Sequence, residues 1–206
     1  MFLYLFWEFL VDIWDTVTIE IQDNRRLKKK ERKRLDGYLN ASPEILRGAA
    51  LQDVFPLVTY RLAHLHKMNL IRELSGLRAV NAAQRIFWIA NAYEQKNDGG
   101  GLCLFLASEF GYTAPLIPMV LGAIGAKEHL ELYCNFIRDN KIDLTVFSNI
   151  EIGKLNAKKR ARYIEELRSK YNFSEFDEKY MALEPIEERL VNFVRENAED
   201  ILAYKR

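Results

Sequence analysis

Apolar residues recur every three or four positions along most of this chain, the spacing that places them on one side of an α-helix. The clearest run extends from Asn81 to Asn97. Its apolar side chains share one face, while Glu94 and Lys96 fall among the residues expected to face solvent. The pattern predicts a helix over 81–97 that packs through its apolar face.

Glycines and one hydroxyl residue mark the boundaries that follow. Asp98 and Gly99–Gly101 should end the first helix, and LCLFLA then predicts a short helix that closes at Gly111. Thr113 is expected to cap a further helix that ends near Gly125. The triple glycine is interpreted as a helix-to-helix corner, because a phosphate-binding loop needs a preceding strand and a following Lys-Ser or Lys-Thr.

Two prolines bear on the helices nearer the N-terminus. Ser42 ahead of Pro43 predicts a helix start, with a capping hydroxyl and a proline at the first helical position. Pro56 lies inside the apolar pattern that follows, so the helix should kink or restart there.

Four more segments complete the C-terminal half. Residues 126–140 repeat the helical pattern, and residues 141–156 are expected to form a linker with weak strand character. Two last helices are expected, a basic one at 157–170 and an acidic one at 185–204.

The first 23 residues are strongly apolar and mostly helical in pattern, although Thr16–Ile21 also alternates like a strand, and both alternatives stay open. Glu8, Asp12 and Asp15 interrupt the apolar run well before the roughly 20 residues of a membrane span, and a basic leader region is missing. We therefore expect no membrane partner and a cytoplasmic location.

Composition fits the helical pattern. The chain has 206 residues, of which 49% are hydrophobic, and only 10 Gly and 5 Pro, which favours a packed all-α protein over a disordered one. We expect a single compact multi-helix domain at 41–206, preceded by an N-terminal helical extension and basic hinge at 1–40. Cys103 and Cys134 are interpreted as small buried residues of a reducing compartment.

The sequence predicts no catalytic, cofactor-binding or metal-binding residues. His64 and His66 are two positions apart, so they point to different faces of a helix, and the cluster around His129 is interpreted as a solvated face. Neither cysteine has the polar, glycine-flanked setting of a nucleophile. A hydrolase with no recognisable motif remains the second alternative.

Charge is balanced overall and uneven locally. The formal net charge is +1, so any attraction to a charged partner must be local. Residues 173–200 hold nine acidic and three basic side chains, a face suited to a partner protein with a basic surface, such as a toxin or a DNA-binding regulator. Self-association into a homodimer also stays open. The predicted partner-binding residues are the anchors Trp7 and Trp14 and the acidic Glu175, Asp177, Glu178, Glu184, Glu187 and Glu188.

The basic run at Arg25–Arg34 has eight cationic residues and one Glu. It is interpreted as a solvated helix or hinge, and contact with an acidic protein partner is the next alternative for this run. Because closely spaced cations displace phosphate counterions, a nucleic-acid-associated protein is the first alternative function, although no aromatic residue is interleaved for stacking on bases.

The segment from Ala82 to Ala126 resembles the DNA-mimic-protein-like (DMP-type) domain family, a bacterial domain of unknown function. The similar positions include Glu94, Asn97, Gly100, Gly101, Phe105, Gly111 and Gly125. The tail from Phe173 to Ile201 is similar to the family's closing region, with Asp177 and Tyr180 in place. Leu104 and Ser108 stand where the family usually has Gln and Asn, and Leu102 replaces the aromatic residue of its turn.

The resemblance implies an all-α fold in which those motif residues are structural. The family's best-known member is an acidic protein that imitates DNA to block a DNA-binding regulator, whereas a chain of charge +1 cannot imitate a polyanion over its whole surface. The expected function is a non-catalytic protein-binding module of a bacterium, acting as an inhibitor, immunity protein or regulator antagonist.

Overall fold

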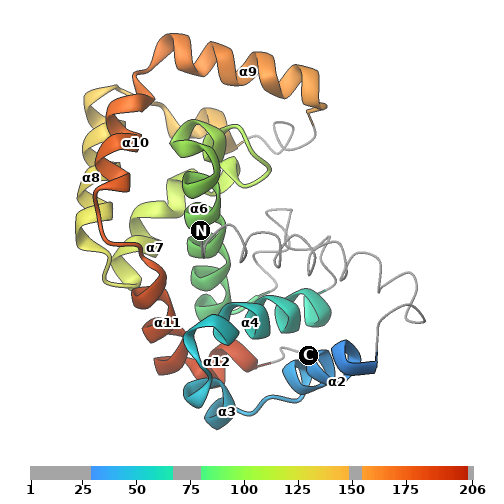
Figure 1. Cartoon of the computed structure of the whole chain (residues 1–206). Helices are drawn as coiled ribbons and strands as arrows, with labels where there is room; N and C mark the ends of the chain where they lie inside the picture. The colour runs from blue at the N-terminus through green and yellow to red at the C-terminus, as the bar shows by residue number, and fades with distance from the viewer. Residues whose placement is uncertain (1–28, 67–79, 149–154, 204–206) are drawn as a thin grey trace. The chain divides into compact units, whose positions relative to one another are not determined.

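The computed structural model describes residues 29–66, 80–148 and 155–203 (Figure 1). These residues form helices and turns and contain no strand, which confirms the all-α class. The apolar segment 1–23, with Trp7, Trp14 and the ambiguous Thr16–Ile21, lies outside the described residues.

The chain divides into two compact units. Unit 1 comprises Met1–Gln84 and Val194–Arg206, and unit 2 comprises Arg85–Phe193. Position 40, where the sequence suggested a boundary, lies within unit 1.

Unit 1 is built around its longest described helix, α4 (Leu51–His66). Its helices are α2 (Lys29–Leu39), α3 (Pro43–Gly48), α4 (Leu51–His66) and α12 (Ala198–Leu202). Helices α2 and α12 both contact α4, and α12 also contacts α3. The Arg61 guanidinium ties the helix ends together, because it donates to the carbonyl oxygens of Leu39 at 2.6 Å, Ala41 at 3.0 Å and Leu202 at 3.0 Å.

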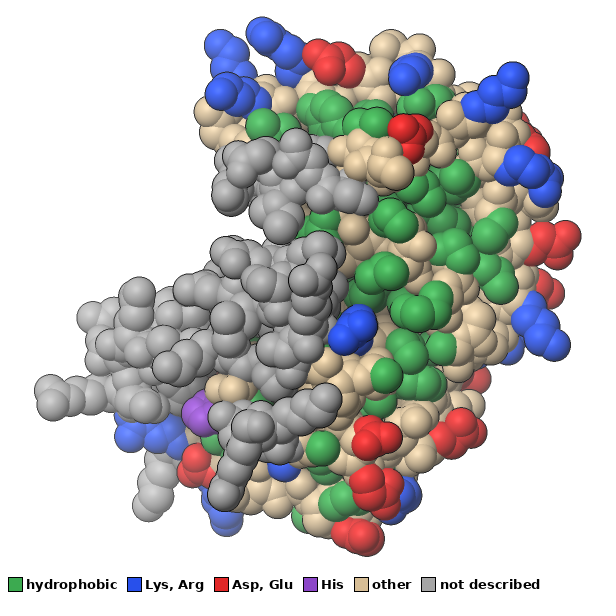
Figure 2. Space-filling view, turned by 180° about the vertical axis from the view of Figure 1, so that it is seen from behind, with side chains coloured by type: hydrophobic (Ala, Val, Ile, Leu, Met, Phe, Trp, Pro, Cys, Tyr) green, Lys and Arg blue, Asp and Glu red, His purple; other side chains and the backbone are tan. Residues whose placement is uncertain are grey.

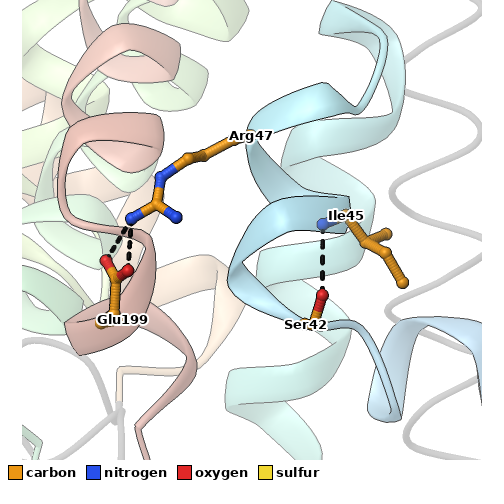
Figure 3. A network of polar contacts seen from close by, with 4 residues as sticks. All are labelled: Ser42, Ile45, Arg47 and Glu199. Atoms are coloured by element: carbon orange, nitrogen blue, oxygen red, sulfur yellow. Dashed lines mark hydrogen bonds and ion pairs between the residues drawn. The ribbon is translucent and has the colours of Figure 1, made fainter.

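The start of α3 follows the sequence prediction. Ser42 Oγ accepts a hydrogen bond from the Ile45 amide at 3.4 Å, and Pro43 occupies the first turn (Figure 3). One turn later, the exposed Arg47 side chain donates to the Glu199 carboxylate of α12. An exposed pair of this kind adds little stability, so the cap is the more important local signal.

Pro56 does not interrupt its helix, which corrects the sequence prediction. Helix α4 continues from Leu51 to His66, and the break falls earlier, at Ala49 and Ala50. A proline removes the hydrogen bond to the carbonyl four residues before it, which here belongs to the exposed Gln52 in the first turn. Water can reach that position, so the helix tolerates the ring.

Helix α6 (Ala82–Leu106) begins and bends where the sequence predicted. Asn81 Oδ1 accepts from the Gln84 amide at 2.9 Å, and the Gln84 side chain accepts from the Asn81 amide at 3.2 Å, which together form a capping box. The backbone leaves helical geometry at Gly100 and at Gly101, which has a φ of 80°, and the LCLFL segment then resumes the helix.

The other helices of unit 2 surround an aromatic core. They are η2 (Gly111–Leu116), α7 (Ile117–Ala123), α8 (Lys127–Asp139), η3 (Leu144–Ser148), α9 (Ala157–Lys170), α10 (Phe173–Met181) and, crossing the unit boundary, α11 (Glu187–Glu196). The fully buried core side chains include Phe87, Tyr93, Phe105, Tyr133 and Phe176.

The structure confirms the helices predicted at 126–140 and 157–170 and corrects three other expectations. Thr113 lies inside η2, where its hydroxyl donates to the Phe110 carbonyl at 2.7 Å instead of capping α7. The described part of 141–156 contains η3 and no strand. The expected helix 185–204 is split at Asn197 into α11 and α12.

The cysteine prediction is right for one residue. Cys103 is buried, but Cys134 is exposed on α8, and both are free thiols. Within the described ranges no single helix is long and apolar enough to cross a membrane. Helix α6 and the helical segment 111–123 reach the required length and apolar composition only when they are taken together, and the two are bent by 98° relative to each other.

Candidate functional site

The candidate site lies between α8 and α10, and the amphipathic pattern of α8 sets one wall. His129, Tyr133 and Phe136 turn inward and are buried. Glu128 and Glu131 are exposed on the other side of the helix. Leu132 lies between these two faces and is half-buried, so α8 presents acidic and apolar side chains next to each other.

Helix α10 supplies the opposite wall with the same periodicity. Phe173, Phe176 and Tyr180 are buried, while Glu175 and Lys179 are exposed and form an i, i+4 ion pair at 2.6 Å. The Phe136 ring lies 5.1 Å from the Phe176 ring, measured between centroids. These aromatic contacts hold the two helices together beneath the surface.

A groove of about 570 Å³ runs between the two helices. Its floor is apolar and its rim is mainly acidic and amide-bearing. The lining residues are Glu128, Glu131, Leu132, Asn135, Phe136, Asp139 and Asn140 from α8 and its end, and Asn172, Glu175, Phe176, Lys179, Ala182 and Leu183 from α10 and its flanks.

The charge on this rim is negative. Lys179 is its one cationic lining residue, and Glu175 already pairs with it. Asp139 accepts from the neighbouring Arg138 at 3.0 Å. Glu128 and Glu131 form no ion pair with any residue that the structure describes. The groove therefore offers two unpaired carboxylates beside an apolar floor, which suits a cationic amphipathic ligand.

A buried carboxyl beneath α10 fixes the position of that helix. Tyr180 donates its hydroxyl proton to Glu94 of α6, and the Ile186 amide donates to the other carboxyl oxygen of Glu94 at 3.3 Å. Burial raises the pKa of Glu94 to about 7, although the Tyr180 hydrogen bond opposes this. The expectation that Glu94 faces solvent is therefore wrong, because α10 covers it.

His129 also belongs to this buried cluster. Its side chain is only 3% exposed, and its ring lies edge-on to the Tyr180 ring with the centroids 5.1 Å apart. Burial lowers the pKa of His129, and the positive charge of Arg189 lowers it further. The interpretation of His129 as part of a solvated face is wrong, since α10 packs over this side of α8. Glu94, His129 and Tyr180 do not line the groove.

Asp177, predicted to bind a partner, is half-buried and hydrogen-bonded within unit 2. Its Oδ1 accepts from the Leu102 amide at 3.0 Å, at the point where the helix resumes after the glycines. Gly101 makes this approach possible, because a Cβ there would lie 2.2 Å from the Asp177 carboxylate. Burial raises the pKa of Asp177, and the Leu102 hydrogen bond opposes the rise.

The other motif residues shape the same region. The Asn97 side chain donates to the Tyr93 carbonyl at 2.7 Å, and the Phe105 ring packs edge-on against Tyr93 at 5.2 Å. A Cβ on Gly111 would lie 2.2 Å from the Leu106 carbonyl oxygen. Gly125 has a φ of 71° between α7 and α8. Gly100 begins the non-helical backbone of the corner.

The remaining predicted partner-binding residues do not converge. Glu178, Glu184 and Glu188 are exposed, while Glu187 is half-buried, and of the acidic residues predicted only Glu175 lines the groove. Sequence reasoning missed Glu128, Glu131 and Leu132. Their i, i+3 and i+4 spacing on α8 was visible, but the facing helix was not.

Among the described residues, no group of three or more His, Cys, Asp or Glu side chains is arranged to hold a metal ion. A family model described as DMP19-like protein matches residues 78–197. The chain belongs to the DMP19-like protein family. The match covers more than half of the chain, contains all of unit 2, and confirms the family predicted from the residues of the glycine corner and the tail. No curated protein and no solved structure matches the chain.

Proposed function

We propose that this chain is a non-catalytic, protein-binding member of its family, working in the bacterial cytoplasm as an inhibitor, immunity protein or regulator antagonist. In this proposal the α8–α10 groove receives a positively charged amphipathic segment of the partner. The observation that carries it is the groove itself, where an apolar floor adjoins the unpaired carboxylates of Glu128 and Glu131.

Each part of the groove has a physical role in this proposal. Contact with the floor, through Leu132 and Phe136, would supply affinity by removing apolar surface from water. The acidic rim would attract a basic partner and speed its encounter, an effect that falls as salt screens the charges.

The arrangement of titratable groups favours binding over catalysis. Glu94 and His129 have shifted pKa values, as catalytic groups often do, but they lie under α10 and do not line the groove. Their partners are a tyrosine ring, a tyrosine hydroxyl and a backbone amide, which position helices.

The test is affinity capture with the full chain in extract of the native cell, comparing two charge-reversed double variants. Glu128→Lys with Glu131→Lys reverses the rim, and Glu165→Lys with Glu166→Lys makes the same charge change on exposed positions of α9. We expect the rim variant to lose a protein that the native chain and the α9 variant both retain.

A third variant separates the floor from the rim. Leu132→Asp places a charge on the groove floor and should abolish capture of the same protein, even at low salt. Circular dichroism checks that each variant is folded. Capture of the same proteins by the rim, floor and α9 variants alike would refute the groove as the binding site.

A further inference from the structure

Helix α9 carries an excess of positive charge that the groove proposal does not use. Its 14 residues, AKKRARYIEELRSK, contain six cationic side chains and two carboxylates. The cations Lys158, Lys159, Arg160 and Arg162 gather in its first half. Figure 2 shows Lys and Arg side chains gathered along the edge of the molecule that α9 forms in Figure 1.

This placement opposes the helix's own stability. The N-terminal end of a helix carries partial positive charge, so cations in its first turn are unfavourable. Helix α9 has no acidic residue in its first turn. Arg160 approaches Glu109 at 3.9 Å, but Lys158, Lys159 and Arg162 are exposed and form no ion pair with any residue in the described ranges. A bound polyanion would relieve that repulsion.

The outward face of α9 fits a nucleic acid better than a lipid surface. A helix that lies on a membrane inserts large apolar side chains, whereas the exposed apolar residues here are only Ala157 and Ala161. Tyr163, Ile164 and Leu167 are half-buried or buried. From Lys158 to Lys170 the helix rises about 18 Å, so its cations can follow several phosphates of one strand.

A polar hollow of about 490 Å³ extends this surface at the C-terminal end of α9. Arg168, Lys170 and Tyr171 line it, and the Lys170 ammonium lies 5.2 Å from the centre of the Tyr171 ring. Asn172 and Ser174 add hydrogen-bonding groups to the lining, and Asp177 adds its one carboxylate, which already accepts from the Leu102 amide. Proteins that bind single strands use this combination: an aromatic ring stacks on a base, and cations beside it neutralise the phosphates.

We propose that α9 and this hollow bind a single-stranded nucleic acid, with Lys158, Lys159 and Arg162 on its phosphates and Tyr171 stacked on a base. The contact is independent of sequence, because base edges are not read. Its surface shares only Asn172 with the α8–α10 groove, and none of Lys158, Lys159, Arg162 and Tyr171 lines that groove, so either proposal can fail without the other.

The experiment measures fluorescence anisotropy of a labelled 20-nucleotide thymidine strand with the full chain at several salt concentrations. Replacing Lys158, Lys159 and Arg162 together with Ala should weaken binding about tenfold or more and reduce the slope of log affinity against log salt by about 2. Tyr171→Ala should weaken binding about fivefold or more at an unchanged slope, and Tyr171→Phe should restore it.

A matched triple variant tests the location. Changing Lys28, Lys29 and Lys30 to Ala removes the same charge from the N-terminal basic run and should leave affinity near that of the native chain. The proposal is overturned by an equal loss in both triple variants, by the absence of binding at low salt, or by binding to anionic vesicles without binding to the strand. Equal affinity for duplex of the same length would overturn the assignment to single strands.

Discussion

The buried Glu94 carboxyl gives a prediction about pH and stability. Glu94 is covered by α10, and no Lys, Arg or His among the described residues forms an ion pair with it. Burial is the main cause of its raised pKa, and the negative charges of Asp98 and Glu187 add to the rise. The Tyr180 hydroxyl and the Ile186 amide oppose it.

The direction of the effect follows from comparing the folded and unfolded states. The carboxyl binds its proton more tightly when folded, since its pKa is raised from 4.5 to about 7. The stabilisation by the proton is fully present below pH 4.5 and is lost as pH rises through 7. Each pKa unit corresponds to about 1.4 kcal/mol, so the full loss is about 3 kcal/mol.

Glu94→Gln removes the titration while keeping the shape of the side chain. Its amide can still hydrogen-bond to Tyr180. We expect the free energy of unfolding of the native chain to fall, relative to the Glu94→Gln variant, by up to about 3 kcal/mol between pH 4.5 and pH 8. Urea unfolding followed by circular dichroism at half-unit pH intervals measures this difference.

A control and a direct titration complete the experiment. Glu128→Gln removes the same charge from an exposed position of α8 and should not reproduce the effect. The ¹³C shift of the Glu94 carboxyl should titrate near pH 7. Parallel stability profiles for the native chain and the Glu94→Gln variant, or titration of Glu94 near 4.5, would refute burial as the cause.

Three further predictions concern the two units. Gly101→Ala should reduce the free energy of unfolding by about 2 kcal/mol or more, seen as a lower melting temperature. A φ of 80° and a Cβ 2.2 Å from a carboxylate oxygen are both unfavourable for alanine. As the control, Gly99→Ala should not destabilise the chain, because nothing lies within 4 Å of the added Cβ. Arg61→Ala should cost about 2 kcal/mol or more by leaving three carbonyls without their donor, as urea unfolding would show. Mass spectrometry after brief alkylation at pH 8 should find Cys134 modified and Cys103 protected, since burial raises the pKa of Cys103 to about 11. The Cys103 Sγ lies 3.8 Å from the carbonyl oxygen of Ile164 in α9, so equal labelling of both thiols would contradict the packing of α9 at this point.

The sequence was most informative where the signal is local. The Ser42–Pro43 start, the corner at Gly100 and Gly101, and the bounds of α9 all appear as predicted. Caps, glycines and helical periodicity act over a few residues, so the same residues that carry these signals also form the structure. Pro56 shows the limit of such a signal, because its effect depends on how close it lies to the helix start.

The acidic tail shows why the candidate site could be predicted only in part. Its charge count treated Glu175 and Asp177 alike. In the structure Glu175 lines the groove, and Asp177 binds the Leu102 amide, 75 positions away in the sequence. The two residues are two positions apart, so they point to different sides of α10. Only the neighbouring elements show that one side lines the groove and the other meets the Leu102 amide.

What the sequence alone determined is an all-α chain of this family, with several of its helix ends and its glycine corner. What tertiary structure alone decided is which polar residues lose their water: Glu94 and His129 lie on helix faces that would be solvated if α10 did not cover them. The physical reason is that periodicity records the apolar face of each helix, while burial of a polar side chain depends on contacts between helices far apart in the chain.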